Sequence, residues 1–244
     1  MARSFGDMVK QYEKNRYSFS GFLGLSEAAD FSDFIKDYDS IPWMLFGGHD
    51  GCERVMLRIG SPETLGYDGP FPIALLKISP RSAKFSDELS HRDFLGALLN
   101  LGIERDTIGD IYIEDNVGYV FCTESMAPYI IENLERVRHT SVDVQVIDEL
   151  PVLKSKEPEE KRIQAASLRL DLVIAHTYNM SRGAAQELFA ARRVFVNGRL
   201  CENNSYELKE KDIVSVRGYG RLKLSKDLGF SRKGKHNLII EVTK

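Results

Sequence analysis

Cysteine and histidine are scarce in this chain of 244 residues, which has three cysteines and five histidines. Cys52, Cys122 and Cys201 lie far apart in the sequence, and an odd, scattered set is typical of reduced thiols, not of a disulfide framework. His49 and Cys52 have the spacing of a zinc-ligand pair, but no second pair at such a spacing occurs elsewhere. We therefore expect reduced cysteines and no metal site.

The chain also lacks a long apolar run. No stretch approaches the roughly 20 apolar residues that a membrane-spanning helix needs, and the first residues, 1–7, lack the apolar core of a signal peptide. Apolar residues make up 43% and charged residues 28%, as in ordinary soluble globular proteins. These features predict a cytoplasmic protein that has no membrane partner.

Motifs for catalysis and cofactor binding are missing as well. The segment 47–51 is rich in glycine, but it lacks the Lys-Ser/Thr of a phosphate-binding loop and a strand follows it, which favours a hairpin turn. His91 and Asp93 have no nucleophile near them in the sequence, so surface pairing is favoured over acid-base chemistry. No candidate set of serine, histidine and aspartate emerges. The sequence predicts neither catalytic residues nor a cofactor.

Charge is distributed unevenly along the chain. Residues 1–160 carry 16 Lys and Arg against 28 Asp and Glu, a net charge of −12, whereas residues 161–244 carry 17 against 8, a net charge of +9. An acidic body with a basic C-terminal part indicates a polyanionic partner that is met at one end of the chain. Two domains with differently solvated surfaces are the alternative explanation.

Residues 1–68 are expected to form an N-terminal region of helices and a β-hairpin. Apolar spacing predicts a helix over 5–17 and a second helix over 27–38, for which Ser26 is the expected N-cap. Strands flank the glycine-rich turn and form the hairpin, over 43–46 and 54–59.

Residues 69–150 are expected to form a ferredoxin-like domain, the arrangement shared by RNA-recognition motifs. Elements follow one another in the order β-α-β-β-α-β, over 71–79, 87–101, 108–114, 117–122, 125–137 and 142–147. The third strand offers alternate aromatics, Tyr119 and Phe121, but lacks the basic residue and the full aromatic-glycine pattern of the usual RNA reader. The first strand is apolar on both faces, which predicts that the N-terminal hairpin covers the sheet. A scaffolding role is favoured, and direct RNA contact is the alternative.

A charged, proline-containing segment, residues 151–162, is expected to link this region to a C-terminal domain at 163–244. Two short helices are expected there, over 168–174 and 182–191, with Ser181 as the N-cap of the second. Strands follow, joined by a tight turn at Asn197-Gly198. The whole chain is thus predicted to be an α+β protein, with two helices on a small β-sheet in its C-terminal domain.

Basic residues of the C-terminal domain gather near the ends of its elements, and we expect them to converge on one face. At the start of a helix, the Arg182 guanidinium and the backbone N–H groups can bind the same phosphate. Gln186, one turn later, can hydrogen-bond a sugar or a base edge. The predicted RNA-binding residues are Arg169, Arg182, Gln186, Arg192, Arg193, Asn197, Arg217, Arg221 and Lys223. The alternative is that Arg169 and Asp171 make local ion pairs and that the other side chains are merely solvated.

Spaced elements within 167–217 carry a resemblance to a known family. They are Arg169-Leu170-Asp171, Ser181-Arg182-Gly183-Ala184-Ala185 and Val194-Phe195-Val196-Asn197-Gly198. This pattern resembles the alpha-L RNA-binding motif of domains like that of ribosomal protein S-four. Arg192 departs from the pattern, because the family usually has a glycine before the strand, and this alters the turn and adds charge.

Further stretches resemble the bacterial YlmH family over nearly the whole chain, from about residue 20. They are Phe46-Gly47-Gly48 with Glu53-Arg54, His91-Arg92 with Leu95-Gly96 and Leu101-Gly102, Gly109-Asp110-Ile111, and Val216-Arg217-Gly218-Tyr219-Gly220-Arg221. The resemblance implies a non-enzymatic RNA-binding factor of the large ribosomal subunit and its tRNA, linked to rescue of stalled ribosomes and nascent-chain quality control. It also implies an association with cell division through the gene neighbourhood.

Three alternative functions rest on smaller features. Arg169-Leu170-Asp171 resembles the catalytic tripeptide of pseudouridine synthases, but too few residues follow it for that catalytic domain. The segment 223–226 resembles the signature loop of class I tRNA synthetases, without their His-x-Gly-His partner or nucleotide-binding domain. An adaptor for cell division would work through the acidic body. We expect instead a monomeric, non-enzymatic protein that docks electrostatically on structured RNA, either rRNA of the large ribosomal subunit or tRNA.

Overall fold

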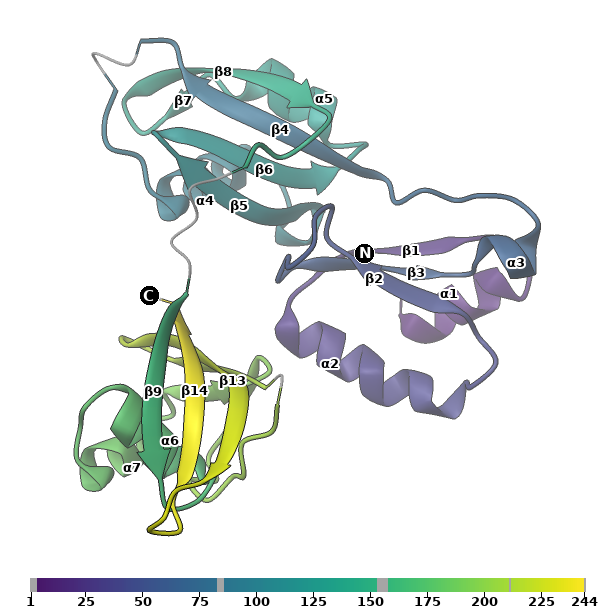
Figure 1. Cartoon of the computed structure of the whole chain (residues 1–244). Coiled ribbons are helices and arrows are strands. Elements are labelled where there is room, and N and C mark those ends of the chain that lie inside the picture. Colours follow the sequence, from purple (N-terminus) through teal and green to yellow (C-terminus); the bar gives the residue numbers. More distant parts are fainter. Residues whose placement is uncertain (1–3, 83–85, 153–157, 211, 244) are drawn as a thin grey trace. The chain divides into compact units, whose positions relative to one another are not determined.

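The computed structural model describes residues 4–82, 86–152, 158–210 and 212–243 (Figure 1). The chain is an α+β protein of helices and antiparallel sheets, and it divides into two compact units between residues 154 and 155. The predicted linker, 151–162, lies partly outside the described residues. Its last residues are not a linker, because a strand begins at Glu159.

The N-terminal part of the first unit is a three-stranded sheet with helices α1 and α2 and a single-turn helix, α3. Its sheet has the strand order β1-β3-β2, and both strand pairs are antiparallel. The elements are α1 (Phe5–Tyr12), β1 (Ser18–Leu23), α2 (Leu25–Phe34), a 3-10 turn (Ile35–Asp37), β2 (Trp43–Phe46), β3 (Val55–Ile59) and α3 (Pro62–Leu65). The predicted β2–β3 hairpin is confirmed, and β1 was not predicted.

Two helix boundaries in this part differ from the sequence prediction. The first helix ends at Tyr12 and not at residue 17, and soon afterwards Asn15 adopts a left-handed φ of 57° that a helix cannot continue through. The second helix begins at Leu25, because the N–H of Gly24 donates to the Glu27 carboxylate at 2.7 Å. The prediction that Ser26 caps this helix is therefore wrong.

The rest of the first unit is built on a second antiparallel sheet, with the strand order β5-β6-β4-β8-β7. Its elements are β4 (Ile73–Pro80), α4 (His91–Asn100), a 3-10 turn (Arg105–Thr107), β5 (Ile108–Glu114), β6 (Val117–Thr123), α5 (Ala127–Asn133), β7 (Arg136–Val137) and β8 (Thr140–Ile147). Ser90 and Asp93 form a capping box that starts α4. The helix ends before Gly102, which has a φ of 78°, the left-handed conformation that favours glycine just after a helix.

Apolar side chains cover this second sheet on both faces. Leu76 and Val120 pack with Phe94 of α4 and with α5 on one face. On the other face, Leu75 and Phe121 pack against Phe22 and Met56 of the first sheet. The predicted cover by the N-terminal hairpin is thus confirmed.

Polar contacts fix this cover in place. The backbone N–H groups of Glu53 and Arg54 donate to the Asp110 carboxylate at 2.6 and 3.1 Å. The Arg54 guanidinium in turn donates to the carbonyls of Phe22 and Ile108. The end of the hairpin therefore binds both sheets of the first unit.

The second unit is a six-stranded antiparallel sheet with two helices (Figure 1). Its strand order is β11-β10-β12-β13-β14-β9. The elements are β9 (Glu159–Ala165), α6 (Leu170–Thr177), α7 (Arg182–Ala190), β10 (Val194–Val196), β11 (Arg199–Leu200), β12 (Ile213–Val216), β13 (Gly220–Phe230) and β14 (His236–Thr243). Strand β9, which was not predicted, pairs with β14 along its whole length.

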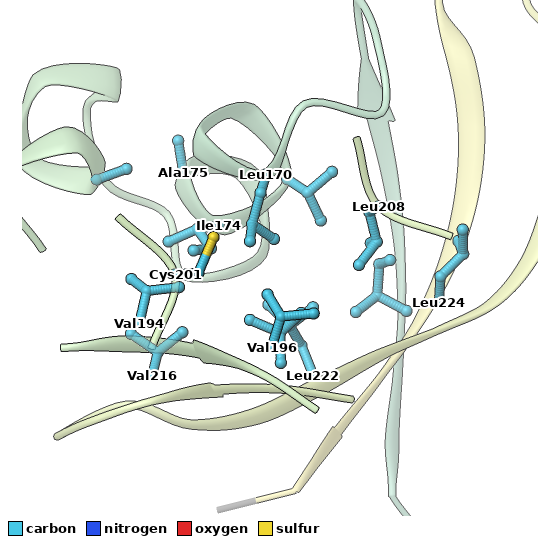
Figure 2. Close-up of a cluster of buried hydrophobic side chains, with 14 of the residues drawn as sticks. Leu170, Ile174, Ala175, Val194, Val196, Cys201, Leu208, Val216, Leu222 and Leu224 are labelled. Carbon is cyan, nitrogen blue, oxygen red and sulfur yellow. The ribbon is translucent and has the colours of Figure 1, made fainter. Parts of the chain in front are cut away.

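The core of the second unit lies between the two helices and one face of its sheet (Figure 2). Leu170 and Ile174 of α6 meet strand residues that alternate along β10, β12 and β13. Leu222 and Leu224 point into this core, so Arg221 and Lys223 between them belong to the opposite face of the sheet. This alternation decides where the predicted RNA-binding cations lie.

Candidate nucleic-acid interface

A buried carboxylate organises the start of both helices in the second unit. Asp171 is fully buried and accepts hydrogen bonds from the Arg169 guanidinium, where Nε and Nη2 each lie at 3.1 Å. It also accepts from Nε of Arg182 at 3.0 Å and from Nε2 of Gln186 at 3.1 Å. We call these four residues the Asp171 cluster, and it joins three of the predicted RNA-binding residues.

The local sequence explains why these side chains meet. Asp171 lies in the first turn of α6, two residues after Arg169, which precedes the helix. Arg182 and Gln186 are four residues apart on α7 and therefore share one face of that helix. Ser181 starts α7, since its hydroxyl accepts from the N–H of Ala184 at 3.1 Å. The predicted N-cap at Ser181 is confirmed.

The charges in the Asp171 cluster reinforce one another. Burial tends to raise the pKa of Asp171, but hydrogen bonds from Arg169, Arg182 and Gln186 outweigh it and hold the pKa below its ordinary value. The hydrogen bond to Asp171 raises the pKa of Arg169. Two cations surround one carboxylate, so the cluster carries a net positive charge. The side chains of Arg169 and Arg182 remain 36% and 50% exposed and are available to a ligand.

Arg192 and Arg193 follow the end of α7, and both are exposed. Arg192 has a φ of 56°, in the left-handed region that favours glycine, and it faces Glu202 at 3.9 Å. The carbonyl of Arg193 accepts from the N–H of Arg217 at 2.9 Å. The Arg193 guanidinium lies close to Gly218, where an added β-carbon would come within 2.5 Å of Nη2.

Three of the predicted RNA-binding residues, Arg217, Arg221 and Lys223, lie on the face of the sheet away from the helices. Phe195 of β10, Ser215 of β12 and Arg221 of β13 are neighbours in register on the face away from the helices. The Arg217 guanidinium lies 4.5 Å from the centre of the Phe195 ring. Lys223 faces Glu241 at 3.7 Å. The prediction that the seven basic residues converge on one face is therefore wrong, because strand alternation separates Arg217, Arg221 and Lys223 from the Asp171 cluster.

The structure gives Asn197 a place in a turn. Its φ is 50° and that of Gly198 is 77°, as in the tight hairpin turns that favour Asn-Gly. Its amide Nδ2 donates to Asp212 at 2.8 Å, and its Oδ1 accepts from the N–H of Ile213 at 2.9 Å. Both ends of the side chain are therefore occupied within the domain.

Sequence reasoning missed one site in the second unit. A cavity of about 550 Å³ lies beside the turn between α6 and α7. It is lined by Lys161, Tyr178, Asn179, Gly218, Tyr219 and Gly220. The repeated glycines around Tyr219 marked this turn in the sequence, but Lys161 lay in the segment taken for a linker.

The described residues offer neither a metal site nor a membrane-spanning helix. Among them, no group of three or more His, Cys, Asp or Glu side chains has an arrangement that would hold a metal ion. No helix in the same part of the chain has both the length and the apolar character to cross a membrane.

Comparisons with known proteins agree with the organisation of the chain. The family model described as "Putative RNA-binding domain in YlmH" matches residues 68–150, and the model of the S4 domain matches residues 168–214. The chain is 28% identical over 245 residues to the "Ribosome-associated protein quality control protein P2" of Bacillus subtilis (strain 168), covering 98% of this chain and 94% of that protein. A solved structure, "Cell division protein ylmH from Streptococcus pneumoniae", is 20% identical, with a TM-score of 0.47, and covers 58% of this chain and 86% of that one.

The YlmH RNA-binding domain comes first in the chain and the S4 domain second, and the Bacillus subtilis relative matches almost the full length of the chain. The RNA-binding function expected from the sequence is thereby confirmed. The chain carries the YlmH RNA-binding domain followed by a C-terminal S4 domain, which is the domain organisation of the YlmH family of RNA-binding proteins.

Proposed function

We propose that this protein is a non-enzymatic factor that docks on structured RNA of the large ribosomal subunit, on tRNA, or on both, and acts in rescue of stalled ribosomes and nascent-chain quality control. The Bacillus subtilis relative is named for ribosome-associated quality control, and it matches along almost the whole chain. We further propose that the protein is a cytoplasmic monomer and needs no cofactor.

The Asp171 cluster is the observation that carries this proposal. Arg169 and Arg182 are held side by side by one buried carboxylate and are still partly exposed. A guanidinium matches the geometry of a phosphate, and Arg182 also lies where the N–H groups at the start of α7 point outward. Asp171 thus orders the two arginines before RNA arrives, which lowers the entropic cost of binding.

The other cations of the second unit extend the contact. Arg193 and Arg192 at the end of α7 add charge next to the helices. Arg217, Arg221 and Lys223 on the far face of the sheet would contact a different RNA segment from the one at the Asp171 cluster. Several phosphate contacts of this kind make affinity fall steeply as salt rises. Asn197 supports the domain and does not touch the RNA.

The surroundings of Asp171 also support a non-catalytic role. A nucleophilic aspartate must reach its substrate, whereas this carboxylate is fully buried and accepts hydrogen bonds from three side chains. We expect the purified wild-type protein to form no pseudouridine in large-subunit rRNA or tRNA. Formation of pseudouridine that disappears in an Asp171→Asn variant would overturn the non-enzymatic assignment.

We also propose a ferredoxin-like arrangement for the domain at 69–150, which follows the N-terminal region at 1–68. Its first strand, β4, lies between β6 and β8, and β5 lies outside β6, with α4 and α5 on one face. Phe121, an aromatic that an RNA reader would use for stacking, is buried under the N-terminal sheet. This burial supports a scaffolding role for that part of the sheet.

Binding to purified large ribosomal subunits tests the proposed function. The double variant Arg169→Ala/Arg182→Ala should bind about tenfold or more weakly, because it loses two charge-assisted contacts. Arg162→Ala/Lys226→Ala is the matched control, since it removes the same charge from two exposed positions outside the Asp171 cluster. Equal affinities of the two double variants would contradict a specific role for the cluster, and a wild-type protein that does not bind subunits or tRNA would contradict the proposal as a whole.

A further inference from the structure

The cavity beside the α6–α7 turn has the volume of a small-molecule site. Its volume of about 550 Å³ falls in the range of roughly 300–1,000 Å³ that is typical of ligand pockets. Three separate segments line it: Lys161 of β9, Tyr178 and Asn179 after α6, and the Gly218-Tyr219-Gly220 turn between β12 and β13. None of these residues belongs to the Asp171 cluster.

Two tyrosine rings give the cavity its aromatic walls. The ring centres of Tyr178 and Tyr219 are 5.3 Å apart, with an angle of 51° between the planes. Tyr178 packs on the core of the unit, whereas Tyr219 is 40% exposed. Tyr219 therefore presents an accessible ring that packs against a ring held by the core.

The cavity also has an unused polar group. Among the described residues, the Tyr178 hydroxyl is buried and has no hydrogen-bond partner, which is unusual for a buried tyrosine. Burial raises the pKa of Tyr178 to about 12, so the hydroxyl keeps its proton and is a donor at neutral pH. This donor is left unused on a residue that lines the cavity.

Two cations lie at or near the cavity. Nζ of Lys161 donates to the carbonyl of Thr177 at 3.2 Å. On the other side, Gly218 has a φ of 91° and no side chain, which leaves room for the Arg193 guanidinium beside the turn. A β-carbon at Gly218 would lie 2.5 Å from that guanidinium, and the positive φ is one that other residues rarely adopt, so glycine favours this approach.

We propose that this cavity accepts one unstacked nucleobase of the bound RNA, stacked on the ring of Tyr219, with a phosphate of the same nucleotide at Arg193. The combination of an exposed aromatic ring, a free hydroxyl donor and neighbouring cations fits a nucleotide that has left its helix. A fully paired helix offers no such base. The inference rests on the proposed RNA-binding function and adds to it: the protein distinguishes RNA with a loop or bulge from plain duplex.

The test uses the full chain and two RNA probes with the same stem. One probe is a stem-loop that carries 2-aminopurine in the loop, and the other is a blunt duplex with no unpaired base. Tyr219→Ala should bind the stem-loop about tenfold more weakly, because one stacked base is lost. It should bind the duplex with unchanged affinity, and its salt dependence should match the wild type because no charge is removed.

Matched variants separate the ring from the charge. Tyr219→Phe keeps the ring and should stay within about twofold of the wild type on both probes. Arg182→Ala should weaken binding to both probes and lower the slope of affinity against salt by about one. The 2-aminopurine fluorescence should change when the wild type or Tyr219→Phe binds, and not when Tyr219→Ala binds. Thermal unfolding of each variant checks that the substitution leaves the fold intact.

Each other outcome has a defined meaning. Equal losses on both probes, or no loss with Tyr219→Ala, would overturn the nucleobase cavity while leaving the RNA-binding function in place. Binding of free adenosine or guanosine monophosphate that Tyr219→Ala abolishes, together with unchanged stem-loop affinity, would overturn it in favour of a free-nucleotide site. A wild-type protein that binds neither probe, nor ribosomal subunits or tRNA, would overturn both the cavity and the proposed function.

Discussion

Asp171 shows how a single side chain acquires its role from residues far away in the sequence. Its pairing with Arg169 was an explicit alternative at the sequence level, because the two residues are only two positions apart on the chain. The contributions of Arg182 and Gln186 depend on how α6 packs against α7, and sequence spacing does not contain that information. The candidate residues could therefore be predicted by type, whereas the buried carboxylate that joins them could not.

The low pKa of Asp171 predicts how the stability of the second unit depends on pH. Because the folded-state pKa lies below the unfolded value, the carboxylate stabilises the fold above the unfolded pKa, and this contribution is lost as pH falls through the folded pKa. Asp171→Asn should lower the free energy of unfolding at pH 7 by about 1–3 kcal/mol and flatten the loss of stability below about pH 4. Urea unfolding between pH 7 and pH 2 measures both effects.

Asp143→Asn is the control for this titration. Asp143 forms an exposed ion pair with Arg81, and exposed pairs of this kind contribute little. If Asp143→Asn changed the loss of stability at acidic pH as much as Asp171→Asn does, the role given to the Asp171 carboxylate would be contradicted.

Asn197 yields a second prediction at this scale. The sequence predicted the Asn-Gly turn, and the structure adds that the side chain bonds Asp212 and Ile213. Asn197→Ala should lower the free energy of unfolding by about 1–2 kcal/mol, since it loses two hydrogen bonds in a left-handed conformation. RNA affinity of the folded variant should match the wild type, and Asn100→Ala at the exposed end of α4 should change neither property.

At the scale of elements, local pattern predicted what is local. The order of the longer strands and helices at 71–147, the hairpin of β2 and β3, and the start of α7 all follow from turn residues, caps and apolar spacing. The short strand β7 was missed, because its residues fall within the helix predicted over 125–137. Strand β1 was not predicted, and neither was β9, whose pairing is not local in the sequence. β9 is rich in charge because it lies at the edge of its sheet, and its partner β14 lies at the other end of the unit in sequence.

The inward face of β9 gives a test of its place in the sheet. Ala165 is fully buried in the core, whereas its neighbour Gln164 is exposed on the other face. Ala165→Asp should lower the free energy of unfolding of the second unit by about 3 kcal/mol or more, because it buries an unpaired charge. Gln164→Asp adds the same charge and should have a small effect. Similar unfolding free energies for the two variants in chemical denaturation would show that β9 is not part of the core.

The contact between the hairpin and the second sheet can be tested at Gly48. An added β-carbon there would lie 2.4 Å from the Phe121 ring, and the φ of Gly48 is 99°. Gly51 has a φ of 86°, and a β-carbon added there would have nothing within 4 Å. Gly51→Ala therefore measures only the cost of placing a non-glycine residue at a positive φ. Gly51→Ala should destabilise the protein by about 1 kcal/mol and Gly48→Ala by about 1–3 kcal/mol more, because the second change also overpacks the core. Equal effects in urea unfolding would argue against a tight contact.

For the whole molecule, the division of charge coincides with the division into units. Residues 1–154 carry 15 Lys and Arg against 25 Asp and Glu, a net charge of −10, and residues 155–244 carry 18 against 11, a net charge of +7. The sequence alone predicted a basic module on an acidic body. It also predicted that the cations would converge, and the sheet instead places them on two faces.

The acidic unit should weaken the attraction of the chain for RNA at low salt. A fragment comprising residues 155–244, which has its own core, should bind a stem-loop more tightly than the full chain when the ionic strength is low. The difference should shrink as salt rises and screens the repulsion. Fluorescence anisotropy over a salt series measures this, and a fragment that binds more weakly at every salt concentration would show that the first unit contributes contacts of its own.

The pairing of β9 with β14 has a consequence for biosynthesis. β9 is the first strand of the second unit to be made and β14 is the last, yet the two lie hydrogen-bonded side by side. During translation, β9 cannot form its hydrogen bonds to β14 until β14 has been synthesised. The first unit, completed earlier, can fold during that interval. The RNA-binding sheet is therefore finished late, so a nascent copy has no complete RNA-binding module while most of it is still being made.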